Sequence, residues 1–230
     1  MSDLRRQELK QSLVHVKERI AAATRQSGRN IDEITLVVVT KTFPVTDAQI
    51  LYELGERNFG ENRNEEGLSK KELVGPDAIW HFQGQVQSKK IRQITQWAEV
   101  VHSLDSVDHA RKFADADNAN ALKFFLQVNL DPSRADRGGV SIAGLQDFLG
   151  EIAGLKNINI IGLMTVAPLG VDPEGAFEEV AKAKNLVQKN YPSITQLSMG
   201  MSGDFEEAIK YGATHIRIGS SILGSRPAQA

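Results

Sequence analysis

A lysine at the end of an apolar run is the residue of this sequence best placed to do chemistry. The run is ITLVVVTK at residues 34–41, and Pro44 follows three residues after Lys41. A continuous apolar run of this length is typical of a strand buried on both faces, and a proline ends the pairing. The run therefore predicts that the amine of Lys41 lies at the carboxyl end of a buried strand. The alternative for this segment alone is a solvated lysine at a strand terminus.

Two turns near the end of the sequence combine glycine with serine. The segments SMGMSGD (198–204) and RIGSS (217–221) each place small residues just before a predicted helix. Backbone N–H groups at a helix start can bind an anion, and glycine permits close approach. The hydroxyls of Ser202 and Ser220 can donate to phosphate oxygens. The two turns therefore predict a phosphate site that includes Gly219, whereas the alternative is that the two serines only cap helices.

Arg217 stands just before the second turn, between the apolar residues Ile216 and Ile218. An arginine at the end of a buried strand must find an acceptor or reach water. The sequence leaves two acceptors open, namely a carboxylate across the fold and a ligand atom such as a ring nitrogen.

A lysine beside a phosphate site indicates Schiff-base chemistry with an aldehyde or ketone. The neutral amine is the reactive form, and burial lowers the pKa of a lysine toward that form. Aldolases and proteins that bind pyridoxal 5′-phosphate (PLP) both fit this description.

The segments that would position these groups alternate between strand and helix patterns. Such alternation is typical of a parallel sheet closed as a single (β/α)8 TIM barrel. The first turn, KTFPVTD, lacks the glycines of a doubly wound nucleotide-binding sheet. We expect one domain over residues 1–230, of which 1–28 form an N-terminal helical extension. The predicted strands are 34–41, 57–60, 78–82, 99–102, 123–129, 157–164, 194–199 and 215–218.

The predicted helices fill the segments between these strands. Three of them have predicted caps, at Thr46 with Asp47, at Ser106, and at Asp204 with Glu207 as a capping box. The predicted helices are 3–27, 46–54, 64–73, 86–97, 106–116, 141–154, 173–190, 204–211 and 220–223.

Composition excludes several classes of protein. The net charge is −2, from 27 basic and 29 acidic residues, so no strongly basic field indicates a nucleic-acid or membrane partner. There is no cysteine, which removes disulfides and thiolate metal sites. The start, MSDLRRQELKQ, does not have the apolar core of a signal peptide. We expect a soluble, cytoplasmic protein with no metal site.

Seven segments resemble, in the same order, the family of PLP-binding proteins concerned with vitamin B6 homeostasis. The resemblance covers almost the whole chain and is more specific than any one motif. The segments are VVVTKTFP around Lys41, FGENRNEE (59–66), WHFQGQVQSKK (80–90), QVNL (127–130), GLMTVAP (162–168), LSMGMSGDFEEAI (197–209) and IRIGSSILGSR (216–226).

The resemblance implies a fold-type III PLP protein, similar to the barrel domain of alanine racemase without its second domain. It implies that Lys41 forms the internal aldimine with PLP and that Arg217 faces the pyridine nitrogen. It also implies that Ser202, Gly219 and Ser220 bind the phosphate, and that Asn62 and Met164 line the pocket. The sequence departs from the usual family residues at Arg63, Gln83 and Lys89.

The expected function is therefore PLP homeostasis, in which a monomer buffers PLP or delivers it to PLP-dependent apo-enzymes and has no catalytic residues. Other B6 vitamers are further expected ligands. An arginine can only donate, so it leaves the ring nitrogen unprotonated and weakens the ring as an electron sink. Tyr52, Tyr191 and Tyr211 fall on predicted helices or directly at the end of one, and His81 is expected to be structural. The alternatives are a fold-type III amino acid racemase or decarboxylase, and a regulatory partner protein that uses PLP as a sensor.

Overall fold

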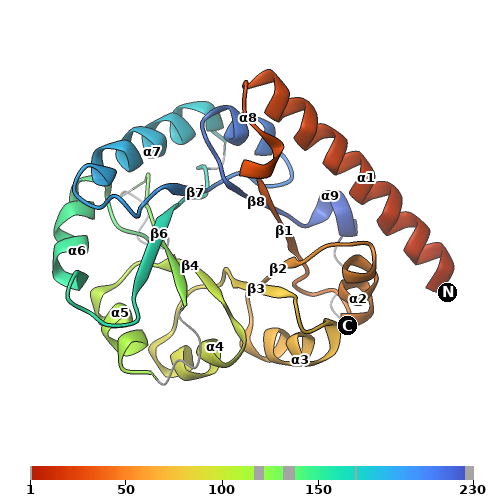
Figure 1. Ribbon diagram of the computed structural model, residues 1–230, viewed down its shortest axis with the longest axis horizontal. Coiled ribbons are helices and arrows are strands. Elements are labelled where there is room, and N and C mark those ends of the chain that lie inside the picture. Colours follow the sequence, from red (N-terminus) through yellow and green to blue (C-terminus); the bar gives the residue numbers. More distant parts are fainter. Residues whose placement is uncertain (1, 117–121, 132–137, 169, 226–230) are drawn as a thin grey trace.

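Eight parallel strands close into a barrel in the order in which they occur along the chain. The computed structural model describes residues 2–116, 122–131, 138–168 and 170–225, so Arg226 of the last motif lies outside the described residues. Figure 1 shows the strands in the middle and the helices in a ring around them. The strands are β1 (Thr35–Val39), β2 (Asn58–Glu61), β3 (Ile79–Phe82), β4 (Val100–Leu104), β5 (Lys123–Gln127), β6 (Asn159–Met164), β7 (Gln196–Ser198) and β8 (His215–Ile218).

Helices follow the strands, as expected for a (β/α)8 barrel, and the predicted fold class is confirmed. Short 3₁₀ turns at Ile31–Glu33, Ser88–Lys90 and Ile142–Gly144 precede β1, α4 and α6. The helices are α1 (Ser2–Gln26), α2 (Val45–Glu53), α3 (Asn64–Val74), α4 (Ile91–Trp97), α5 (Val107–Ala114), α6 (Leu145–Ile152), α7 (Pro173–Gln188), α8 (Phe205–Lys210) and α9 (Ser220–Leu223).

The barrel is closed by pairing between its first and last strands. Val37 of β1 lies opposite Arg217 of β8, and Val38 lies opposite Ile218. The chain therefore leaves β1 toward Lys41 and β8 toward Ser220 at the same edge of the sheet. This closure brings residues near positions 40 and 220 together.

Helix α1 lies outside the barrel, alongside α8 and α9 (Figure 1). Its buried face carries Leu9, Leu13 and Val16. Arg5 donates to the carboxylate of Asp47 at 2.7 Å and to the carbonyl oxygen of Leu223, the last residue of α9, at 3.0 Å. The first helix thus holds the end of the last one.

Two of the predicted helix caps are wrong. Helix α2 begins at Val45, with no side-chain cap, and the buried carboxylate of Asp47 pairs with Arg5 of α1 instead. Asp204 precedes α8 but forms no capping bond, because its carboxylate accepts from the N–H of Met201 at 2.6 Å. The cap at Ser106 is confirmed, since its side chain accepts from His109 N–H.

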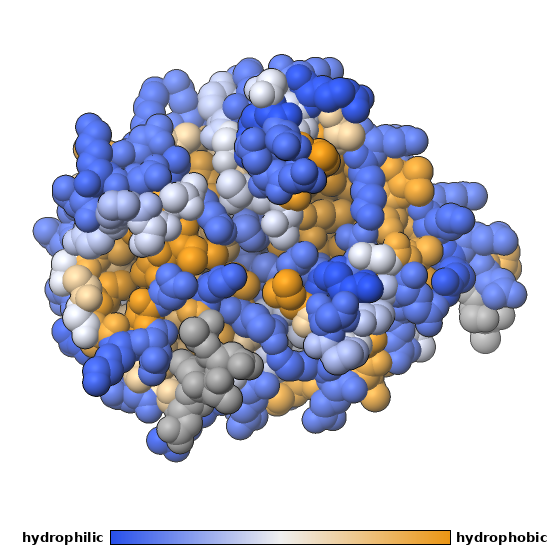
Figure 2. Space-filling view, in the orientation of Figure 1, coloured by the Kyte–Doolittle hydropathy of each residue, from blue (hydrophilic) through white to orange (hydrophobic). Residues whose placement is uncertain are grey.

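Large apolar side chains fill the space between the strands and the helix ring. Phe59, Trp80 and Trp97 are fully buried and their rings pack against one another, with Phe59–Trp80 centroids 5.3 Å apart. Figure 2 shows hydrophilic residues over most of the outer surface on this side, and apolar residues between the helices and the barrel. None of the helices in the described ranges combines the length and apolar character needed to cross a membrane.

We predict that Gly162→Ala lowers the free energy of unfolding by about 2 kcal/mol, because overpacking against a rigid neighbour is destabilising. A Cβ at Gly162 of β6 would lie 2.1 Å from the carbonyl oxygen of Gln196 on β7, and backbone there cannot yield without disturbing the strand pairing. Urea unfolding followed by circular dichroism measures the change. Gly154→Ala is the matched control, because nothing lies within 4 Å of a Cβ at that position. Equal stability of the two variants would contradict this account.

Candidate functional site

A cavity of about 360 Å³ opens at the carboxyl ends of β1, β7 and β8. This is the edge of a parallel barrel where active and binding sites lie. Five of the seven residues that the sequence singled out are among its lining residues. The cavity is lined by Val39, Lys41, Phe43, Gln83, Met201, Ser202, Gly203, Arg217, Gly219, Ser220, Gly224 and Ser225.

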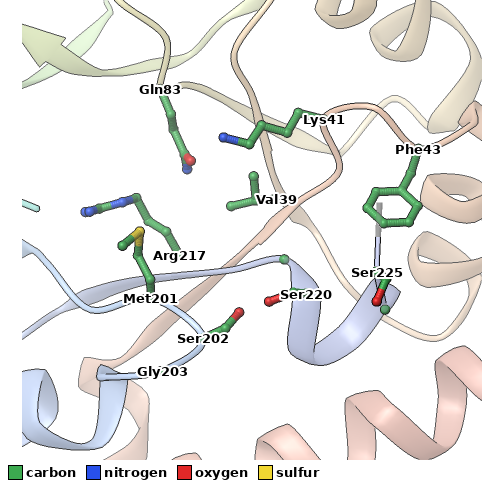
Figure 3. A pocket seen from close by; sticks show the side chains of 12 residues that line it. Val39, Lys41, Phe43, Gln83, Met201, Ser202, Gly203, Arg217, Ser220 and Ser225 are labelled. Carbon is green, nitrogen blue, oxygen red and sulfur yellow. The ribbon is translucent and has the colours of Figure 1, made fainter. Parts of the chain in front are cut away.

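Lys41 lies two residues beyond the end of β1, in a tight turn. The N–H of Phe43 donates to the carbonyl oxygen of Thr40 at 3.1 Å, which closes a β-turn with Lys41 and Thr42 in its middle. Figure 3 shows the Lys41 side chain extending into the cavity, with its amine directed toward the end of the Gln83 side chain. The predicted strand ended two residues later than β1 does, but it placed the Lys41 amine at the correct edge of the sheet.

The two serine turns face each other across one side of the cavity. In Figure 3 the hydroxyls of Ser202 and Ser220 come from different loops and lie close to one another. Gly219 packs so tightly that a Cβ there would lie 3.1 Å from the carbonyl oxygen of Val39. The backbone N–H groups of Ser202, Gly203 and Gly219 donate no hydrogen bond to another described residue. These turns therefore offer hydroxyl and N–H donors to an anion.

Arg217 is buried, and its guanidinium is held from two sides. It donates to the hydroxyl of Ser198 at 2.6 Å and to the carbonyl oxygen of Thr165 at 2.8 Å. Burial lowers the pKa of Arg217 to about 10, and the carboxylate of Asp204 opposes that shift. Arg217 is thus cationic at neutral pH. Its side-chain hydrogen bonds go to neutral oxygens, and no carboxylate within the described ranges forms an ion pair with it.

A chain of hydrogen bonds runs from Ser198 into the barrel interior. Ser198 Oγ lies 2.8 Å from His102 Nδ1, His102 Nε2 lies 2.8 Å from His81 Nδ1, and His81 Nε2 lies 3.0 Å from Asn58 Oδ1. Because the amide oxygen of Asn58 accepts, each group in the chain donates toward it, and Ser198 keeps a lone pair for Arg217. Burial lowers the pKa of His81 and of His102 well below the usual range, so both stay neutral.

His81 therefore belongs to the barrel interior and does not line the cavity. Its ring bonds toward Asn58, which begins β2 at the opposite end of the strands from Lys41. This position agrees with the structural role expected for it.

Asn62 and Met164 lie outside the residues that line the first cavity. Met164 lines a second cavity of about 330 Å³, which borders the first at Gln83. Asn62 follows β2, and its carbonyl oxygen lies 2.2 Å from where a Cβ on Gly84 would stand. Gln83 is a departure from the usual family residues, and its buried Nε2 has no hydrogen-bond partner among the described residues.

The other two departures lie away from the first cavity. Lys89 lines a separate surface cavity with Lys112, and Arg63 is exposed beside Glu66 at 3.5 Å. The described part of the chain contains no group of three or more metal-ligating side chains.

A buried ion pair lies directly behind the Lys41 turn, and sequence reasoning missed its lysine, Lys70. Lys70 of α3 is 4% exposed and donates to Glu61 at 2.6 Å and to the carbonyl oxygen of Thr40 at 2.8 Å. Glu61 also accepts from the hydroxyl of Thr40 at 2.7 Å, and burial raises the pKa of Glu61. No local pattern indicated that Lys70 is buried, because it stands in a helix rich in charges.

Comparison with known proteins places this barrel among its relatives. The family model of the alanine racemase N-terminal domain matches residues 12–227. The chain belongs to this family. It is also 36% identical to a pyridoxal phosphate homeostasis protein of Mycobacterium leprae, over 96% of this chain and 93% of that protein. The resemblance to PLP homeostasis proteins that the sequence suggested is thereby confirmed.

Solved structures of similar proteins share the barrel. The structure of PipY of Synechococcus elongatus PCC7942 with PLP bound has a TM-score of 0.81 and 32% identity, and covers 91% of this chain and all of that one. Alanine racemase of Corynebacterium glutamicum has a TM-score of 0.70 at 15% identity, which shows the likeness of fold. The match spans 96% of this chain and 62% of that racemase.

We predict that acid destabilises the protein through its buried histidines. Burial, and then the charges of Arg217 and Lys123, lower the pKa of His215 from 6.5 to about 4. The unfolded chain therefore binds more protons than the folded one between those values, so the free energy of unfolding falls as pH falls from 6.5 to about 4. His215 alone accounts for about 3 kcal/mol over that range, and His81 and His102 add to it.

Urea unfolding at several pH values tests this expectation. His215→Gln should flatten the dependence of the free energy of unfolding on pH between about 4 and 6.5. His15→Gln is the control, because His15 is exposed on α1. If His215→Gln leaves the slope as steep as His15→Gln does, the buried imidazole of His215 is not its source.

Proposed function

We propose that this protein binds PLP as a Schiff base on Lys41 and buffers it or delivers it to PLP-dependent apo-enzymes, without substantial turnover. One observation carries the proposal: the amine of Lys41 and the donors of the two serine turns face a single cavity. The PLP-bound structure of a relative that is 32% identical supports the choice of ligand.

The cavity has the size and donors that PLP requires. A volume of about 360 Å³ lies within the range of small-molecule sites. We assign the phosphate to Ser202, Gly219 and Ser220, whose hydroxyl and N–H groups can donate to its oxygens. Asn62 and Met164 are proposed to contact the cofactor from the adjoining side. Other B6 vitamers with a phosphate are proposed to use the same donors, and we propose that the protein acts as a monomer.

Bound PLP supplies an aldehyde that a primary amine can attack. Lys41 would hold the group through its neutral amine, which would form a C=N bond to the aldehyde carbon with loss of the two amine hydrogens and the aldehyde oxygen as water. The step needs no oxidant or reductant, and water reverses it. Reversibility suits a protein that stores an aldehyde and gives it up.

Arg217 favours holding the cofactor over transforming an amino acid. Its guanidinium only donates, and Ser198 and Thr165 fix its direction. Facing the ring nitrogen, it would leave that nitrogen unprotonated and so weaken the ring as an electron sink. Lys41 and Arg217 are also the two ionisable side chains among the described residues that line the cavity. Racemisation needs a second group that can move a proton, and Arg217 can only donate hydrogen bonds. The lining residues therefore support the low turnover proposed.

We predict that the protein incubated with PLP gains the absorption of a Schiff base, and that borohydride reduction fixes a pyridoxyl group on Lys41. Peptide mass mapping locates the group. Lys41→Ala should abolish the adduct, because it removes the attacking amine, whereas Lys89→Ala is a control on a separate surface cavity.

A reducible adduct that persists on another residue in Lys41→Ala would contradict the assignment of the lysine. Steady racemisation or CO₂ release with a panel of amino acids would instead support the alternative that the protein is a racemase or decarboxylase. Both assays use the PLP-loaded protein, so one preparation distinguishes carrier from enzyme.

We predict that substitutions at Arg217 and Ser202 have different effects, because Arg217 contacts the ring of PLP and Ser202 contacts its phosphate. Arg217→Met should shift the absorption maximum of bound PLP, with an affinity change of about threefold or less, because it alters the ring environment. Ser202→Ala should weaken PLP binding by about tenfold or more, as expected for loss of one hydrogen bond to a charged group, and leave the spectrum unchanged. Absorption titrations measure both quantities. An unchanged spectrum in Arg217→Met would remove Arg217 from the ring site.

A further inference from the structure

The turn that carries Lys41 is held in a conformation that its own sequence disfavours. Thr42 has a φ of +69°, and it is the third residue of the β-turn from Thr40 to Phe43. A positive φ at this position is normally left to glycine, because a side chain then crowds the backbone. For a β-branched residue the strain is of order 1–3 kcal/mol. The hydroxyl of Thr42 is also buried without a hydrogen-bond partner among the described residues.

Glu66 of α3 holds this strained turn. Its Oε2 accepts a hydrogen bond from the backbone N–H of Thr42 at 2.8 Å. Two cations fix the same carboxylate, since Lys70 Nζ lies 3.7 Å from Oε2 and Arg63 lies 3.5 Å from Oε1. Glu66 therefore acts on the residue immediately after Lys41.

Lys70 holds the residue on the other side of Lys41. It donates to the carbonyl oxygen of Thr40, the same oxygen that closes the turn, and it pairs with Glu61. Thr40 is thus bound through its carbonyl by Lys70 and through its hydroxyl by Glu61. Both peptide neighbours of Lys41 are fixed by side chains from β2 and α3, while the Lys41 side chain extends into the cavity (Figure 3).

We propose that Glu66, supported by Lys70, is a positioning residue that holds the Thr40–Phe43 turn and thereby aims the Lys41 amine at its electrophile. The inference rests on the proposed function, because it takes Lys41 to be the group that reacts with an aldehyde. Without the carboxylate, Thr42 relaxes to a negative φ, and the peptide that carries Lys41 rotates. The phosphate donors lie on other loops, so their affinity for a phosphate stays the same.

Two ligands distinguish an effect on the direction of the Lys41 amine from an effect on ligand binding. PLP has an aldehyde that needs Lys41, whereas pyridoxine 5′-phosphate has an alcohol in its place and needs only the ring and phosphate contacts. In Glu66→Ala, the rate of Schiff-base formation with PLP should fall about tenfold, which corresponds to about 1.4 kcal/mol. The affinity for pyridoxine 5′-phosphate should change by about twofold or less. Stopped-flow absorption and calorimetry measure the two quantities.

Two further variants test the cause. Glu66→Gln keeps an oxygen that can accept from Thr42 N–H, so its rate should stay within about threefold of the original protein. Thr42→Gly adopts a positive φ without strain, so adding it to Glu66→Ala should restore most of the lost rate. These variants leave the buried pair of Lys70 and Glu61 intact, and urea unfolding confirms that each one folds.

The outcomes are distinguishable. If the original protein forms no adduct on Lys41, the proposed function fails. If it does form one, the positioning role fails when Glu66→Ala keeps the full rate, when Glu66→Ala weakens both ligands equally, or when Thr42→Gly does not restore the rate. A fall specific to PLP that Thr42→Gly reverses supports the role of Glu66.

Discussion

Pairing between β1 and β8 is the interaction on which the site depends. The register sets Val37 beside Arg217 and Val38 beside Ile218, so the next residues of both strands emerge at one edge. Lys41 and Ser220 are far apart in sequence and become neighbours only through this pairing. A shift of the register by one residue would turn Arg217 to the other face of the sheet, because side chains alternate along a strand. The cavity is therefore a product of barrel closure.

Polar groups inside the barrel fix the position of the Arg217 guanidinium. The chain from Asn58 through His81 and His102 ends on Ser198, whose oxygen accepts from Arg217. A buried charge is costly unless its hydrogen bonds are satisfied, and Ser198 and Thr165 accept from this one. The neutral His102 orients Ser198 without adding a second cation. The barrel interior thus combines apolar packing with one directed polar chain. Its far end is anchored at the beginning of β2.

The sequence predicted the barrel and five of the residues that line the cavity, because buried strands read as apolar runs and the residues after them must share one edge. It did not predict which side chains hold the residues of the cavity in place. Ser198 and Met164 end neighbouring strands in similar sequence contexts, yet Ser198 bonds to Arg217 while Met164 lines the second cavity. Lys70 is surrounded by charges in a helix of mixed polarity, so helical periodicity did not reveal that it points inward. Such contacts depend on tertiary packing, which local patterns do not encode.

The contact between α1 and α9 has a consequence for synthesis on the ribosome. Arg5 and its acceptor Leu223 are 218 residues apart, so the first helix emerges long before its last partner exists. Leu9, Leu13 and Val16 then remain without their full cover until α8, β8 and α9 have left the exit tunnel. Contacts of such long range also slow folding. A nascent chain that stalls before β8 would therefore expose an apolar helix face and an unpaired edge of β1, which are the features that chaperones and proteases recognise.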